Sequence, residues 1–230
     1  MGGRGRWIGI TASAMLLACS AAPPGKAGND RDTGRGLRQC TDIRGYLTDK
    51  TPQGRAVHER PDPGSPVLGR VAPPNKDPAN VYDVAVGFDI RGSRGGWLLI
   101  EGAGDDPVLT EQPPRAMYSG RGWIRAGGVG VNVQTSQAFA RPRHSSAILV
   151  QSAESSGLDD QVEAAACDGH WVLGRWKIRD PSAVRYEPST VIARDPLTVE
   201  AWATGICNIQ ETSCDGVNGD RPEEAPLNSS

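Results

Sequence analysis

Residues 56–71 read AVHERPDPGSPVLGRV and recur in altered form as QAFARPRHSSAILVQS at residues 137–152. The shared landmarks are an Arg-Pro dipeptide, a serine and two later tryptophans, found at Arg60-Pro61, Ser65, Trp97 and Trp123 in the first copy and at Arg141-Pro142, Ser146, Trp171 and Trp202 in the second. Self-similarity of this kind indicates one supersecondary unit that occurs twice.

The residues around these landmarks predict strands rather than helices. The chain holds 29 glycines and 18 prolines, so helix-breaking residues recur every few positions. Apolar residues alternate with polar or small ones from Tyr82 to Ile90 and again from Val129 to Val133, which is the period of a half-buried strand. Short apolar runs at 97–100, 147–150 and 171–173 predict further strands. The segment 158–167 has helical propensity, but the repeat favours a strand there.

The expected fold is therefore all-β, with two tandem small barrels, one for each copy of the repeat. The predicted divisions are a signal peptide at 1–18, a flexible tether at 19–39, a first domain with an N-terminal arm at 40–128, a second domain at 129–214 and a disordered tail at 215–230. The tether and the tail are predicted from their content of Pro, Gly and charged residues.

The order of landmarks resembles the bacterial SH3-like domains of exported cell-envelope proteins. In the first copy the resemblance is carried by Arg60-Pro61, Ser65, Val67-Leu68-Gly69, Trp97 and Gly122-Trp123-Ile124. The second copy diverges, because Val150 replaces the glycine after Ile148-Leu149 and Ala201 precedes Trp202. The resemblance implies SH3-like barrels and ligands such as cell-wall peptides, glycans or protein segments.

Residues 1–19 have the features of a bacterial lipoprotein signal. Two arginines precede an apolar stretch from Trp7 to Ala18 that is too short to cross a hydrocarbon core. The sequence LLAC ending at Cys19 resembles the lipobox, which implies cleavage after Ala18 and acylation of Cys19, for example with palmitate. Several acyl chains would anchor the protein stably in a membrane. Ser20, where an aspartate would retain a Gram-negative lipoprotein, points to the outer membrane, facing the periplasm.

Four of the five cysteines remain after Cys19 is assigned to the lipid: Cys40, Cys167, Cys207 and Cys214. An even number in an exported chain predicts two disulfides. Cys40–Cys167 with Cys207–Cys214 is one pairing, and Cys167–Cys207 with Cys40–Cys214 is equally compatible with the sequence.

The tryptophans are the candidate binding residues. Trp97, Trp123, Trp171 and Trp202 occupy matched positions, and their ordinary role would be to fill the cores of small barrels. The functional alternative is an aromatic groove for a peptide or glycan. Trp176 has no counterpart in the first copy and is the better candidate for surface contact. Cys167 and His170 have ligand-like spacing, but no further partner completes a zinc set, so we expect neither a metal nor a cofactor.

These features favour a non-catalytic envelope lipoprotein that binds peptidoglycan or a periplasmic protein. The net charge of −2 argues against nucleic acid, which requires a basic face. One alternative is an inhibitor or immunity-type protein that blocks a toxin or a wall hydrolase. Another is a cell-wall enzyme, but the chain shows no nucleophile motif and no helix to hold a reactive cysteine.

Overall fold

The computed structural model describes residues 36–76, 83–110, 112–152, 158, 161–207 and 218–222. Strands dominate this part of the chain, which contains only one short helix, α1 (Pro107–Thr110), and one 3-10 turn, Pro188–Thr190. The expectation of an all-β protein is confirmed, including the strand favoured near residue 160, which forms as β12 (Gln161–Asp168). The signal peptide and Cys19 lie outside the described residues.

The first repeat builds one half of the main sheet. Its strands pair in the order β1 (Arg38–Leu47), β6 (Gly87–Arg94), β7 (Trp97–Gly104), β8 (Gly122–Arg125), β2 (Arg55–His58) and β3 (Val67–Val71). Each neighbouring pair is antiparallel. A separate two-stranded sheet pairs β4 (Asn75–Lys76) with β5 (Asp83–Val84).

The second repeat builds the other half with the corresponding order. Its strands are β9 (Val129–Val133), β12, β13 (Trp171–Lys177), β16 (Leu197–Ala203), β10 (Gln137–Phe139), β11 (Ile148–Ser152) and β14 (Val184–Tyr186). Two further strands flank this path: β15 (Val191–Arg194) pairs with β16, and β17 (Ile206–Cys207) pairs with β9.

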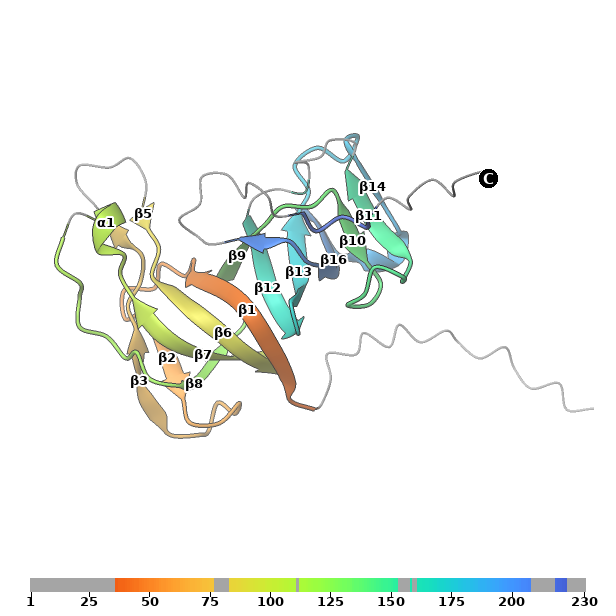
Figure 1. The fold of residues 1–230 in the computed structure, drawn as a ribbon. Helices are drawn as coiled ribbons and strands as arrows, with labels where there is room; N and C mark the ends of the chain where they lie inside the picture. The colour runs from red at the N-terminus through yellow and green to blue at the C-terminus, as the bar shows by residue number, and fades with distance from the viewer. Residues whose placement is uncertain are drawn as a thin grey trace, which may run out of the picture. The chain divides into compact units, whose positions relative to one another are not determined.

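The prediction of two small, separately closed barrels is wrong. Fifteen of the 17 described strands form a single open antiparallel sheet (Figure 1). In this sheet β1 pairs with β9 through Tyr46 with Gly130 and Leu47 with Val129. A repeated sequence specifies which strands form, but it does not specify whether the outer strands of each copy close on each other. Unpaired strand edges favour pairing, and here the leading strands of the two copies satisfy that tendency by pairing with each other.

The internal repeat itself is visible in the structure. The amide of Arg60 donates to Ser65 Oγ at 2.9 Å, and the amide of Arg141 donates to Ser146 Oγ at 3.1 Å. His58 pairs with Trp123 between β2 and β8, as Phe139 pairs with Trp202 between β10 and β16. The matched landmarks therefore form the same turn and the same strand contacts in both halves.

Burial follows the strand alternation and joins the two repeats. The main core draws on both, with fully buried side chains that include Leu47, Phe88, Ile90, Leu98, Ile124, Val131, Val162 and Val199. A second, smaller apolar cluster contains Ala165, Ala166, Leu173 and Trp202, with Trp171 packed against it. The shared main core holds the two halves of the sheet in one arrangement.

Candidate functional site

A disulfide links the two repeats. Cys40 in β1 and Cys167 in β12 are bonded, with their Cα atoms 5.7 Å apart, and both residues are buried. The Ser93 hydroxyl donates to Cys167 O at 2.9 Å and accepts from Cys167 N at 3.0 Å. This pair belongs to the first of the two pairings that the sequence left open. Cys207 is also disulfide-bonded, and Cys214 lies outside the described residues.

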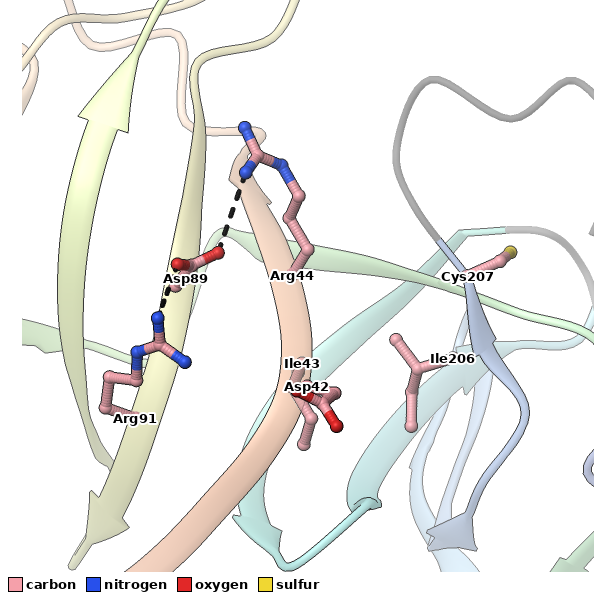
Figure 2. A pocket seen from close by; sticks show the side chains of 7 residues that line it. All are labelled: Asp42, Ile43, Arg44, Asp89, Arg91, Ile206 and Cys207. Atoms are coloured by element: carbon pink, nitrogen blue, oxygen red, sulfur yellow. Dashed lines mark hydrogen bonds and ion pairs between the residues drawn. The ribbon is translucent and has the colours of Figure 1, made fainter.

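A pocket of about 290 Å³ opens along β1, the strand that carries Cys40 (Figure 2). Its lining comes from three elements: β1, β6 and the short strand β17. The lining residues are Asp42, Ile43, Arg44, Asp89, Arg91, Ile206 and Cys207. Arg44 extends from β1 toward Asp89, whereas Asp42 lies beside Ile43, where a shift in the β1–β6 register interrupts the strand alternation (Figure 2). Alternation in β6 presents Asp89 and Arg91 together, so the charges of Arg44, Asp89 and Arg91 lie close to one another.

The charges of this pocket form a chain of ion pairs. Asp89 lies between two guanidinium groups, 3.6 Å from Arg44 Nη1 and 2.7 Å from Arg91 Nη2 (Figure 2). Arg91 also donates to Glu101 at 2.6 Å, and this hydrogen bond, followed by the charges around it, raises the pKa of Arg91. Arg91 therefore stays cationic at any physiological pH.

Arg44 has hydrogen-bonding capacity to spare. Its Nε is buried, yet it has no hydrogen-bond partner among the described residues. Asp42 is also available, since its side chain is 81% exposed. His170 Nδ1, 3.9 Å from Asp42 Oδ2, forms an ion pair with it only when the imidazole is protonated. Asp42 has a φ of 52°, an uncommon conformation that aspartate tolerates better than most residues. It lies where the β1–β6 register shifts. Asp42 thus presents an accessible acceptor, whereas the donor without a partner among the described residues, Arg44 Nε, is buried.

The candidate tryptophans form two corresponding aromatic clusters. In the first repeat, the rings of Trp97 and His58 pack in a T-shaped arrangement with their centroids 5.2 Å apart, and Arg125 Cζ lies 4.4 Å from the Trp97 ring centroid. In the second repeat, the ring centroid of Trp171 lies 5.5 Å from that of Phe139 and 4.9 Å from that of His144. These clusters bring together the Arg-Pro turn and the first tryptophan of each repeat.

The exposure of the tryptophans separates core positions from surface positions. Trp97 and Trp202 are 4% and 6% exposed, whereas Trp123 and Trp171 are only partly buried. Trp176, which the sequence favoured for surface contact, is 1% exposed and belongs to the main core. Its ring is therefore not presented to a ligand. Trp123 and Trp171 are the two that keep accessible surface.

The charged pocket could not be predicted from the sequence. Asp89 and Arg91 lie within a predicted strand, at the polar positions of its alternation, and this was the one available signal. Asp42 and Arg44 lie in the segment treated as an N-terminal arm, whose central place in the sheet had no motif to reveal it. A pocket that depends on strands distant in sequence has no local signature.

Within the described residues, no group of His, Cys, Asp and Glu side chains has the arrangement of a metal site. No helix among them has the length and apolar character needed to cross a membrane. Comparison of the chain with protein-family models, with curated proteins and with solved structures finds no match.

Proposed function

We propose that this chain is an exported, lipid-anchored binding protein of the bacterial cell envelope. It acts by recognition rather than catalysis, and its ligand is a peptide-bearing component of the envelope, either peptidoglycan or a protein. The observation that carries the proposal is the Cys40–Cys167 disulfide. Disulfides persist in oxidising compartments outside the cytoplasm, and this one connects strands that the shared core requires to be adjacent.

The lipoprotein features of residues 1–19 support the same location. A lipid on Cys19 would hold the folded part near a membrane surface and within reach of the wall. The landmarks that resemble envelope SH3-like domains support an envelope role as well. They support no barrel, because the strands of the two repeats form one sheet.

The charged pocket supports recognition of a group that carries both signs. Arg44 and Arg91 face carboxylates of a ligand, and Asp42 faces an ammonium group. Short peptides with free carboxylates and amines, such as those that cross-link cell walls, have this chemistry. Arg44, Asp89 and Arg91 are paired with one another, and Asp42 is exposed. Hydrogen bonds between such ionised groups and a charged ligand are stronger than neutral ones.

Lipidation and location are tested by expressing the full chain and a Cys19→Ala variant in a bacterial host. We expect the wild type to incorporate a labelled fatty acid and to fractionate with membranes, and the variant to lose both properties. A wild type that stays in the cytoplasm, or that carries no acyl chain, would refute the anchor.

Binding is tested by sedimentation with purified peptidoglycan. Arg44→Gln removes one pocket cation, and Arg194→Gln removes an exposed arginine on β15 as a matched control. We expect Arg44→Gln to weaken retention by about tenfold, the scale of one charge-assisted hydrogen bond, and Arg194→Gln to leave it unchanged. Equal retention of both variants would exclude the pocket as the binding site. If peptidoglycan retains none of these proteins, a protein ligand remains, and the blocking of a toxin or hydrolase becomes the hypothesis to examine.

A further inference from the structure

Residues 218–221 lie against the second repeat, although they are distant from it in sequence. They fall in the range for which the sequence predicted a disordered tail. The Gly219 amide donates to Gln134 O at 2.9 Å, and His144 Nε2 lies 3.3 Å from Gly219 O. We call these four residues, Asn218 to Arg221, the strap, and we call the surface beneath them the strap groove. That groove is formed by residues 134–137, 144–146 and 204–205.

The Asp220 carboxylate is the most heavily bonded group of the strap. It accepts from Thr135 Oγ1 at 2.7 Å, from the Ser136 amide at 2.6 Å and from the Ser136 hydroxyl at 2.7 Å. Hydrogen bonds to an ionised acceptor are about twice as strong as neutral ones. The groove therefore recognises a carboxylate through three donors that come from two adjacent residues.

Arg221 is bound by backbone carbonyls. Its Nε donates to His144 O at 2.7 Å and its Nη2 donates to Ser146 O at 2.6 Å, while the guanidinium lies 5.7 Å from the centroid of the Phe139 ring. The cation thus covers the aromatic cluster of the second repeat. Arg221 itself is exposed, so its contacts are directed to one side only.

Gly219 fits a space that admits no side chain. A Cβ at this position would clash with the backbone carbonyl of Thr204, and a Cβ on Gly205 would lie 2.6 Å from the Gly219 amide nitrogen. The groove therefore selects a small residue directly before the carboxylate. Taken together, its contacts describe a preference for the sequence Gly-Asp-Arg.

The first repeat closes the equivalent surface with its own side chains. Gln53, which aligns with Gln134, has its carbonyl bonded by Arg70 Nε at 2.5 Å. Ser65, which aligns with Ser146, has its carbonyl 3.1 Å from His58 Nδ1. In the second repeat the aligned residues of Arg70 and His58 are Gln151 and Phe139. Neither Gln nor Phe supplies those contacts here, and the strap makes them instead.

We propose that the strap groove is a peptide-binding site that the chain's own residues 218–221 occupy in cis. Its ligand in trans is an extended segment of a partner protein that carries Gly-Asp-Arg or a close equivalent. The strap binds mainly through backbone groups and two charged side chains, so a partner segment with the same three residues can reproduce every contact. This site shares no lining residue with the charged pocket and does not depend on the function proposed for that pocket.

The test uses the full chain with Asp220→Ala and Arg221→Ala together, which removes both charged contacts of the strap. The probe is a fluorescent peptide with the sequence of residues 218–222, NGDRP, and the control peptide is NGAAP. A tethered ligand competes at an effective concentration on the order of millimolar. We therefore expect NGDRP to bind the double variant at least about tenfold more tightly than the wild type, and NGAAP to bind neither. If the folded double variant fails to bind NGDRP, or binds NGAAP equally well, the proposal is overturned.

A measurement on the wild type covers the case in which the double variant does not fold. Hydrogen exchange at the amides of Ser136 and Gly219 reports opening of the strap, and exchange at core amides such as that of Val131 reports opening of the sheet. An exchangeable ligand must leave while the sheet stays closed. We expect Ser136 and Gly219 to exchange at least about tenfold faster than Val131. Exchange of all three at one common rate would show that the strap opens only on global unfolding and would refute exchange in trans.

Discussion

Replacement of both Cys40 and Cys167 by alanine would remove the covalent link between β1 and β12. The two cysteines are separated by 127 residues in the sequence. For a loop of that length, the restriction of the unfolded chain corresponds to a loss of about 16–17 cal/mol/K, or about 5 kcal/mol at 25 °C. Engineered and natural disulfides often contribute less than this limit, so we expect the free energy of unfolding to fall by about 3–5 kcal/mol.

The assay is equilibrium unfolding in guanidinium chloride, followed by tryptophan fluorescence under non-reducing conditions, so that the disulfide at Cys207 stays intact. The dependence of the unfolding free energy on denaturant should become steeper in the double variant, because its unfolded chain exposes more surface. Ser93→Ala is the matched control. It removes the two hydrogen bonds to the Cys167 backbone without touching the link, and we expect it to cost about 1–2 kcal/mol with an unchanged slope.

A loss below about 2 kcal/mol in the double variant, with no change in slope, would refute this reasoning. It would mean that the unfolded chain already keeps the two repeats together without the covalent link. An equal effect of Ser93→Ala on both the free energy and the slope would assign the stabilisation to local packing instead of chain restriction.

Three further predictions concern single residues. The Arg115 guanidinium, which hydrogen-bonds Asp105, holds the pKa of that carboxyl below its usual 3.8. The ionised carboxylate therefore stabilises the fold above about pH 4, and this stabilisation is lost as the pH falls further. Asp105→Asn should lower the unfolding free energy by about 2 kcal/mol at pH 7 and flatten the acid limb of a curve of stability against pH. Trp176→Ala should cost about 3–5 kcal/mol in thermal or chemical unfolding. Trp176→Phe should cost less than half of that, because phenylalanine keeps an aromatic ring in the core and loses only the smaller ring, whose indole N–H has no partner among the described residues; equal losses would contradict this account. Gly130→Ala would place a Cβ 2.5 Å from the Tyr46 ring at the β1–β9 junction, so we expect it to lower the melting temperature by several degrees, and a neutral result would argue against the continuous sheet.

The sequence was sufficient for the strands and insufficient for their closure. Alternation around Phe88 and Val131 predicts strands because period-two burial is a local property. The pairing of Tyr46 with Gly130 is not local, and nothing in either segment distinguishes it from pairing within one repeat. The Cys40–Cys167 link was among the possible pairings, but choosing it required knowing that β1 lies at the centre of the sheet.

The candidate sites show the same division between local and distant information. The Arg-Pro turns and the tryptophans next to them were visible because they repeat. The pocket was not, since Arg44 and Asp89 come from strands far apart in sequence. The prediction that Trp176 is a surface residue is wrong, since its ring fills the shared core. It has no counterpart in the first repeat, but the two repeats need not contribute matching residues to one core.

The two repeats differ at polar positions of their paired strands, and these differences bear on why the two candidate sites differ. In the first repeat, Asp89 and Glu101 face each other across β6 and β7, and Arg91 bridges them. In the second, Glu163 faces Arg175 across β12 and β13. Apolar positions on both sides remain compatible with one core, so polar positions can change without loss of the fold. A ligand site in one repeat therefore does not predict a copy in the other, and the pocket and the strap groove must be tested separately.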